Sequence, residues 1–348
     1  MNDRALSLLE QYDIEVLRTR KGRGTFICET KQGGLTFQEY AGNPEKLRLQ
    51  QAILERIRTL GLVKAEELIP NREGRLFVKD SDGVCYILKT HFEGNECDIY
   101  DNRQCVEVIQ LLARLHHCME GAPADVIEYG ADSQEEGSLS PQTEQEEAVL
   151  RTWSLQAYSP LKEYEKHNRE MMRVRTYLKK KGQKQIFEKR LLGSMEYFVE
   201  RALQVTESWR QLESGSCLAL CHGDFQHHNI LRTQDGWRIV NFEKLQQDDP
   251  VRDVYLFMRK VMEKNNWPVP QGMELLNAYE AVRSLSEYSR QDLYHRFAYP
   301  EKFWKIVNFY YNSPKAWIPE KNLEKLEKVI SQEEEKQRFL GEVFAKNS

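Results

Sequence analysis

Polar side chains suited to phosphoryl transfer gather in one short segment. His222-Gly223-Asp224 is followed, five residues after the aspartate, by Asn229. Phosphoryl transfer requires clamped phosphates, one or two magnesium ions and an acceptor hydroxyl that faces a carboxylate. Asp224 is placed for the last role, as the base, and the amide oxygen of Asn229 can ligate magnesium. The spacing is specific because a hydrophobic strand, beginning at Ile230, follows it directly.

A second pair of polar residues follows the next hydrophobic run. Residues 237–240 are predicted to continue as a strand that ends near Asn241 and Glu243. Magnesium sites of this kind rely on one or two carboxylates plus phosphate oxygens. Asn241 offers an uncharged amide where a carboxylate is expected. Glu243 lies on the same side if the segment is extended, and it is a candidate substitute ligand.

These motifs resemble the aminoglycoside/choline phosphotransferase family, a branch of the protein-kinase-like fold. The whole chain is similar to the CotS-type spore coat members of that family. The closer match rests on residues 241–244 (Asn-Phe-Glu-Lys), 249–253 (Asp-Pro-Val-Arg-Asp) and 255–262. The resemblance covers nearly all of the chain in element order, but it is specific only within residues 218–267. It implies that Asp253 supports the backbone of the catalytic loop.

Two departures from the family pattern bear on activity. Active members bind magnesium through an aspartate at the position of Asn241, and a lysine on the third strand holds the α- and β-phosphates. The alignment places Gln38 at the position of that lysine, and no lysine occurs between Gly33 and Tyr40. Two charged ligands are therefore replaced by neutral amides, which predicts weak affinity for Mg-ATP. In the same family context, His222 is expected to support the loop.

The order of predicted elements places strands first and helices later, which is typical of an α+β fold. A helix is expected over residues 44–60, and Gly61 ends it. The turn at residues 21–24 contains Arg23, which can meet a nucleotide phosphate, although such a two-glycine turn is more often a plain hairpin. Strands are predicted at residues 14–17, 25–30, 35–39, 76–78 and 85–88.

The later part of the chain has helical periodicity. Apolar residues recur at helical spacing from Val108 to Leu115, a long helical region is expected over residues 159–212, and an amphipathic helix carries Leu326. Residues 135–147 are acidic and polar, which predicts an exposed loop. With the resemblance, this pattern predicts a bilobal protein-kinase-like fold. Its small N-terminal antiparallel-sheet lobe would cover residues 1–91, and its larger, mainly helical lobe residues 92–348.

Composition excludes several classes of protein. The 348 residues are 40% hydrophobic and 30% charged, with a net charge of −4, so no general attraction to nucleic acid or anionic membrane is expected. No apolar run is long enough for a membrane span, and the first residues lack a secretory signal. The seven cysteines include no Cys-x-x-Cys pair, so most are expected to be reduced core residues.

Three further clusters have simpler interpretations than a ligand site. His222, His227 and His228 lie on an extended loop where at most two side chains converge, which argues against zinc. The basic residues in 179–190 are typical of a solvated helix end, with an anionic partner as the alternative. The aromatic residues in 303–317 are expected mainly in the core, although they could line an acceptor site.

Three functions remain open from the sequence. The first, resting on the resemblance, is a structural or assembly protein of the spore coat with a degenerate, pseudokinase-like site. It would be made in the mother-cell cytoplasm, join other spore coat proteins and need no cofactor. The second is an active ATP-dependent phosphotransferase that acts on a small hydroxylated substrate, with Mg²⁺ bound by Asn229 and Glu243. The third is a nucleotide sensor that binds ATP without turnover.

Overall fold

The chain forms two compact units. The computed structural model describes residues 3–22, 24–44, 46–120, 159–212, 218–312 and 319–344. One unit comprises residues 1–157 and 218–248, and the other comprises residues 158–217 and 249–348. The predicted division into lobes at residue 91 stays a prediction. The unit that holds the sheet also includes residues 218–248, the segment with the polar motifs.

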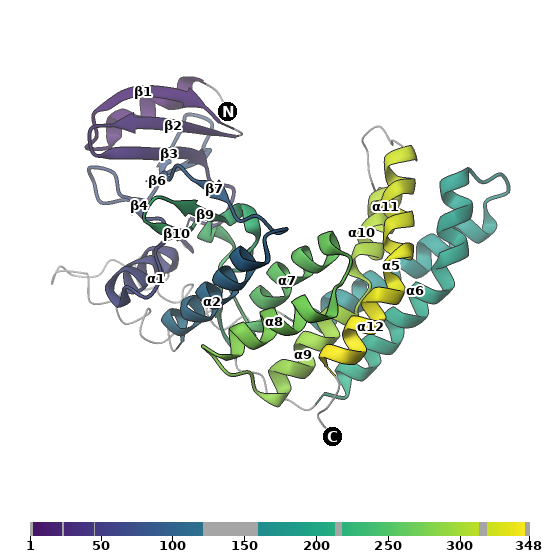
Figure 1. Ribbon diagram of the computed structural model, residues 1–348. Helices are drawn as coiled ribbons and strands as arrows, with labels where there is room; N and C mark the ends of the chain where they lie inside the picture. Colours follow the sequence, from purple (N-terminus) through teal and green to yellow (C-terminus); the bar gives the residue numbers. More distant parts are fainter. Residues whose placement is uncertain are drawn as a thin grey trace, which may run out of the picture. The chain divides into compact units, whose positions relative to one another are not determined.

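An antiparallel sheet forms the first part of unit one (Figure 1). Its strand order is β1 (Val16–Lys21), β2 (Thr25–Thr30), β3 (Gly33–Glu39), β6 (Cys85–Thr90) and β4 (Leu68–Ile69), and β5 (Val78–Lys79) also pairs with β6. The strands predicted at residues 25–30 and 35–39 are confirmed. The strand predicted at residues 14–17 begins at Val16 and is longer, with a register shift between Val16 and Arg18.

The two faces of this sheet have different roles. Phe37 and Leu88 point into a buried cluster that is covered by Tyr12 and the 3-10 helix η1 (Asp3–Gln11). Their neighbours point to the opposite face, because successive side chains in a strand alternate. Thr36 pairs directly with Lys89 in the β3–β6 register, and Gln38 pairs with Ile87. That face therefore presents Gln38 and Lys89 side by side.

Two helices and two small sheets complete unit one. Helix α1 (Lys46–Leu60) ends at Gly61, which has φ +65°, as predicted. Helix α2 (Asn102–Met119) begins after Asp101, whose carboxylate accepts two backbone hydrogen bonds. The small sheets join β7 (Asn95–Glu96), β9 (Ile230–Thr233) and β10 (Gly236–Ile239), and β8 (Ala219–Cys221) with β11 (Gln246–Asp248).

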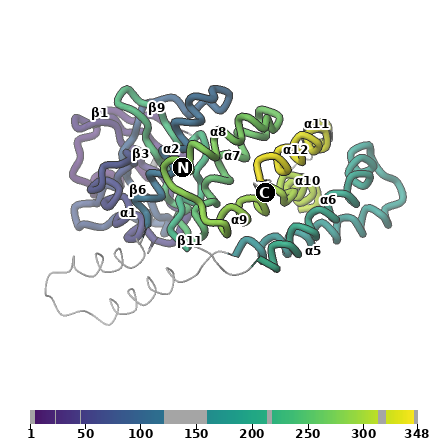
Figure 2. Tube along the Cα trace, turned by 60° about the horizontal axis from the view of Figure 1, so that its bottom comes forward, coloured from purple at the N-terminus to yellow at the C-terminus, as the bar shows by residue number. Residues whose placement is uncertain are grey.

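Unit two is helical in its described part. Helices α5 (Pro160–Lys180) and α6 (Ile186–Arg210) run alongside each other as a hairpin (Figure 2). The helical region predicted over residues 159–212 thus consists of two helices. The remaining helices are α7 (Val251–Asn265), α8 (Val269–Glu280), α9 (Glu287–Ala298), α10 (Glu301–Asn312), α11 (Pro319–Ser331) and α12 (Glu333–Val343).

Side chains in unit two modify two sequence predictions. Phe303 is buried as expected, but Phe309 and Tyr311 of the aromatic cluster are 45% and 52% exposed. Trp317 lies outside the described residues. Part of the basic stretch is paired within the unit, since Arg190 contacts Glu327 at 2.7 Å. This pairing accounts for one of its charges without an external partner.

Other predictions concern the whole described chain. The six described cysteines are free, and all except the half-buried Cys85 are buried. None of the helices within the described ranges is long and apolar enough to cross a membrane. The loop predicted at residues 135–147 lies outside the described residues.

Candidate functional site

A short segment before β4 connects the sheet to the motif region within unit one. The backbone N–H of Glu66 donates to the carbonyl of Ile239, and the N–H of Ile239 donates to the carbonyl of Lys64, both at 3.0 Å. Two residues later, Leu68 pairs with Lys89 in the β4–β6 register. This double attachment brings Glu66, the end of β10 and Lys89 to one place.

Lys89 is the centre of the resulting polar cluster. Its Nζ lies 2.7 Å from Asn241 Oδ1, 2.7 Å from Glu243 Oε1 and 3.1 Å from Glu66 Oε2. The side chains of Lys89 and Glu66 are 4% and 1% exposed. Gln38 Nε2 also donates to Glu243 Oε1, at 2.9 Å. Residues from two strands, the 64–66 segment and the 241–243 turn thus meet around one ammonium group.

The charges in this cluster stabilise one another. Burial alone favours the neutral form of Lys89, but the carboxylates of Glu66 and Glu243 outweigh it and hold its pKa above the usual range. Burial likewise favours neutral Glu243, yet the Lys89 ammonium lowers the pKa of that carboxyl. Both groups are therefore charged near neutral pH.

Hydrogen bonds lead from this lysine to the loop of Asp224 in a fixed direction. An ammonium can only donate, so the atom of Asn241 that faces Lys89 is its carbonyl oxygen. Asn241 Nδ2 then donates to Asn229 Oδ1 at 2.8 Å, and Asn229 Nδ2 donates to the backbone carbonyl of Asp224 at 2.8 Å. Asn229 is 1% exposed, and this chain of bonds gives its buried amide one partner at the nitrogen and one at the oxygen.

The conformation around Asn241 corrects one sequence prediction. The sequence places Glu243 on the same side as Asn241 if the segment is extended. Instead Asn241 is left-handed, with φ +68°, and Phe242–Lys244 forms the 3-10 helix η3. The turn still brings both side chains to Lys89, because Phe242 N donates to Glu66 Oε1 at 3.1 Å and fixes the start of η3. The expected proximity is thus present, but its geometric reason was wrong.

His222 and Gly223 shape the loop that carries Asp224. His222 is fully buried; its Nε2 donates to the carbonyl of Val240 at 3.1 Å, and its Nδ1 accepts from Asp224 N at 3.2 Å. Gly223 has φ +78°, and a Cβ there would lie 2.0 Å from the carbonyl oxygen of Lys244. The loop therefore requires glycine at this position. These contacts agree with the loop-supporting role expected for His222.

The carboxylate of Asp224 has two partners of its own. Gln226 Nε2 donates to Oδ1 at 2.7 Å, and Lys244 Nζ lies 2.8 Å from Oδ2. The side chain of Lys244 is 66% exposed, so this surface pair contributes little energy and exchanges readily with solvent. Each carboxylate oxygen has a second lone pair, so Asp224 can still accept a hydrogen bond from an acceptor hydroxyl beside these two partners.

Magnesium does not fit the described side chains as they are arranged. The amide oxygens of Asn229 and Asn241 both accept hydrogen bonds, and an ammonium lies between Asn241 and Glu243. Magnesium requires oxygen ligands at about 2.0–2.1 Å in near-octahedral geometry. Binding would have to displace the Lys89 ammonium from both oxygens. Among the described residues, no group of three or more His, Cys, Asp or Glu side chains is arranged to hold a metal.

The predicted site residues are placed as follows. Gln38, Asn229, Asn241 and Glu243 come together, with Asp224 at the end of the same hydrogen-bond chain. Arg23 lies outside the described residues. Asp253 is fully buried in the first turn of α7, in unit two, and its role as loop support stays a prediction.

Sequence reasoning missed Lys89 and Glu66. The family pattern places its lysine on the third strand, whereas Lys89 belongs to the strand that pairs with it. A lysine directly after the apolar run 85–88 was the available signal. Glu66 had none, since its burial depends on contacts with residues far along the chain.

Comparisons with known proteins agree with this architecture. The family described as "Spore coat putative kinase YutH" matches residues 141–343, more than half of the chain. The chain belongs to this YutH family of spore coat proteins. A relative in sequence is spore coat protein S of Bacillus subtilis (strain 168). It is 25% identical over 340 residues, which cover 95% of this chain and 89% of that protein.

Solved structures similar to this YutH-family chain are phosphotransferases. An aminoglycoside phosphotransferase from Alicyclobacillus acidocaldarius gives a TM-score of 0.76 at 15% identity, covering 96% of this chain and 93% of that one. Spectinomycin phosphotransferase APH(9)-Ia, in complex with ADP and spectinomycin, gives 0.58 at 12%, covering 96% and 98%. Amicoumacin kinase hAmiN, in complex with AMP-PNP and Ca²⁺, gives 0.56 at 10%, covering 97% and 94%. The kinase-like phosphotransferase fold is thereby confirmed.

Proposed function

We propose that this protein is a structural or assembly component of the spore coat that carries a degenerate phosphotransferase site. Membership of a spore coat family and the similarity to spore coat protein S over most of both chains support the location. Synthesis in the mother-cell cytoplasm, followed by assembly with other coat proteins, is part of the same proposal. The catalytic fold then serves as a scaffold.

One observation carries the degenerate-site part of the proposal. The side chain of Asn241 is bonded at both ends, to Lys89 Nζ and to Asn229 Oδ1. A metal ion would compete with a covalently attached cation for the same oxygens, and like charges repel at this range. Asn241 also lacks the charge of a carboxylate, so the site has less attraction with which to displace the lysine.

Thermal unfolding of the purified protein with and without millimolar Mg-ATP tests the proposal. A ligand present at about 100 times its dissociation constant stabilises the folded state by roughly 2.7 kcal/mol. For a chain of this length, that stabilisation would raise the midpoint by about a degree or more. We expect no shift. A magnesium-dependent shift would contradict the degenerate site, and one without phosphotransfer would support the nucleotide-sensor hypothesis.

The variant Asn241→Asp provides a sharper test at the residue concerned. A carboxylate can accept from Lys89, but its other oxygen would face Asn229 Oδ1 with no proton between them. We expect Asn241→Asp to lose about 1–3 kcal/mol of stability without metal, the typical cost of an unsatisfied buried polar group. Millimolar Mg²⁺ should restore part of this loss by filling the gap.

The matched control is Asn266→Asp. Asn266 is also left-handed, with φ +62°, but it is exposed and lies in unit two. Urea unfolding of both variants, with Mg²⁺ or with EDTA, should reveal a magnesium effect in Asn241→Asp alone. Equal magnesium responses in the two variants would contradict the assigned direction of the hydrogen bonds, in which Asn241 accepts from Lys89 and donates to Asn229.

An active small-molecule phosphotransferase is the second candidate. Its supporting observation is that Lys89, paired with Glu66, offers a buried cation next to Gln38, at the place where the family uses a lysine for phosphates. Asp224 would then serve as the base. Phosphotransfer to a hydroxylated acceptor that disappears in Asp224→Ala would favour this candidate, whereas coat assembly that tolerates Asp224→Ala favours the scaffold.

A further inference from the structure

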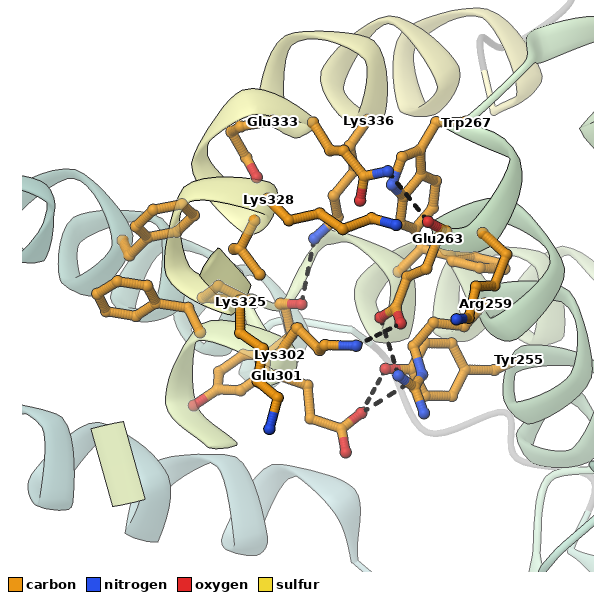
Figure 3. Close-up of a pocket in the computed structure, with 18 residues that line it drawn as sticks. Tyr255, Arg259, Glu263, Trp267, Glu301, Lys302, Lys325, Lys328, Glu333 and Lys336 are labelled. Atoms are coloured by element: carbon orange, nitrogen blue, oxygen red, sulfur yellow. Dashed lines mark hydrogen bonds and ion pairs between the residues drawn. The ribbon is translucent and has the colours of Figure 1, made fainter. Parts of the chain in front are cut away.

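A second site of interest is a cavity within the helical unit. It has a volume of about 260 Å³ and is lined by residues of α7, α11, α12 and the segment 297–303 (Figure 3). All of these residues belong to unit two. The cavity therefore shares no residue with the Lys89 cluster, and an inference about it stands independently of the proposed function.

Positive charge is concentrated around this cavity. Six cationic side chains line it against three carboxylates, although the whole chain has a net charge of −4. Such a local excess of positive charge attracts anions. The cationic lining residues are Arg259, Lys264, Lys302, Lys325, Lys328 and Lys336.

The carboxylates neutralise only part of this charge. Glu263 contacts Arg259 and Lys302, each at 2.9 Å. Glu301 is paired with Lys305 and lies 4.0 Å from Arg259 Nε. That Nε is buried and makes no hydrogen bond to any described residue. A buried guanidinium N–H without an acceptor is costly, and a ligand oxygen would relieve that cost.

The remaining cations have no carboxylate partner in the described part of the chain. The third carboxylate, Glu333, accepts hydrogen bonds from Tyr197 and Gln337 instead of from a lysine. The ammonium groups that consequently lack an ion pair among the described residues belong to Lys264, Lys325, Lys328 and Lys336. Four such groups around one small cavity suit a ligand with more than one negative charge.

An aromatic surface accompanies these cations. Trp267 is 4% exposed and lines the cavity, and the Nζ of Lys336 lies 5.8 Å from its ring centroid. The only other polar contact of that ammonium among the described residues is a 3.4 Å approach to the carbonyl of Tyr299. Phe297 is a further aromatic lining residue. Ligand pockets commonly combine such apolar walls with a few charged groups that fix orientation.

We infer that this cavity binds a small molecule with one flat apolar ring and a dianionic headgroup, such as a phosphate monoester or a dicarboxylate. The ring would lie against Trp267, which Phe297 supports from behind. The headgroup would contact Lys336 and the exposed ammonium groups of α11. A single-ring ligand matches the volume, which is near the lower end of the usual range for ligand sites.

Calorimetric titration of the full-length protein in EDTA, with phenyl phosphate as the probe, tests this inference. Binding is expected, and it should weaken as salt rises, because the interaction is ionic. The variant Lys336→Met keeps an unbranched side chain against Trp267 but removes the charge. It should weaken binding at least about tenfold, as for the loss of one hydrogen bond to a charged group.

Two variants on α11 form the matched control. Lys328 and Lys321 are both exposed, but only Lys328 lines the cavity. Lys328→Gln should weaken phenyl phosphate binding by about threefold or more, whereas Lys321→Gln, with the same change in net charge, should not. Equal affinities of these two variants would overturn the inference, because the probe would then bind elsewhere or only through overall charge.

Other probes distinguish the parts of the ligand. If phthalate competes with phenyl phosphate, the result would support the cavity as the binding site and show that it accepts a dicarboxylate as well as a phosphate. Inorganic phosphate that binds as tightly as phenyl phosphate would contradict the aromatic part of the inference. Absence of binding of both phenyl phosphate and phthalate at millimolar concentration would overturn the site as a whole. A missing Mg-ATP shift has no bearing on any of these results.

Discussion

At the scale of single residues, Lys89 is the central charge of the buried polar cluster in unit one. A buried ammonium is unfavourable unless anions and hydrogen-bond acceptors surround it. Here Glu66 and Glu243 supply the charge and Asn241 supplies a neutral acceptor, all within 3.1 Å. Removal of the lysine would leave two carboxylates without their cation.

We therefore expect Lys89→Met to lose about 3–5 kcal/mol of stability, as is typical when one partner of a buried ion pair is removed. Urea unfolding at neutral pH measures the change. Lys79→Met is the control, because Lys79 is an exposed lysine of the same sheet. Its effect should stay within about 0.5 kcal/mol.

A second substitution separates charge from packing. Adding Glu243→Gln to Lys89→Met removes one of the stranded carboxylates. The double variant should therefore be more stable than the sum of the single changes predicts, since coupled residues are not additive. Strict additivity would mean that the Lys89–Glu243 contact contributes nothing measurable.

The pair Asn229 and Asn241 was predictable from the sequence because both residues belong to a motif with fixed spacing. Lys89 was harder to predict, because its neighbours Ile87 and Leu88 are typical of an ordinary strand. Its importance comes from contacts with Glu66 and Glu243. Glu243 lies more than one hundred and fifty positions after Lys89 in the sequence. Such contacts depend on the tertiary fold and leave no local pattern.

At the scale of elements, local turns explain where the sequence predictions differ from the structure. The left-handed Asn241 turns the chain from β10 into η3, so an extended backbone was the wrong expectation there. The predicted helical region 159–212 is interrupted between Lys180 and Ile186. A capping box formed by Gln185 and Glu188 begins the second helix. Single turns of this kind depend on side-chain contacts that periodicity alone does not reveal.

Helix α5 gives a prediction for pH dependence. His167 is buried against Trp304, with ring centroids 3.4 Å apart, and burial lowers its pKa to about 4. Its neutral form therefore stabilises the fold fully above the unfolded pKa of about 6.5, and this contribution falls as the pH drops towards 4. We expect a loss of about 2 kcal/mol from this group between pH 7 and pH 5.

The variant His167→Phe should remove that part of the pH dependence, because phenylalanine can still stack on Trp304 but does not titrate. Unfolding free energies at pH 7 and pH 5 check the expectation. His117→Phe is the comparison, since the His117 side chain is 67% exposed. If the wild type and His167→Phe lose the same stability on acidification, His167 is not the group responsible.

At the scale of the whole molecule, the order of elements was the most predictable property. The strands of the large sheet precede the helices of unit two, as predicted, whereas β8, β9, β10 and β11 fall between α6 and α7. The grouping of residues 218–248 with the sheet was not predictable, because β7 pairs with β9 and the segment 64–66 bonds to Ile239 across long sequence separations. The helical unit contains its own cavity, which no sequence motif indicated.

The two units should respond separately to local changes. All partners of Lys89 lie in unit one, so Lys89→Met should accelerate amide hydrogen exchange mainly in β9, β10 and the sheet. Exchange in α5 and α6 should remain close to that of the wild type. Comparable acceleration in those helices would mean that the two units open as a single cooperative structure.

The cation bonded to Asn241 and Glu243 is part of the polypeptide. Its local concentration is therefore fixed by the covalent chain and does not depend on the ionic composition of the surroundings. Dilution, chelators or competing divalent ions cannot remove it, so the arrangement around β10 and η3 should persist in media that would strip a metalloenzyme. A protein that must keep one conformation while its chemical surroundings change would benefit from a cation that is covalently part of the chain, as the Lys89 ammonium is.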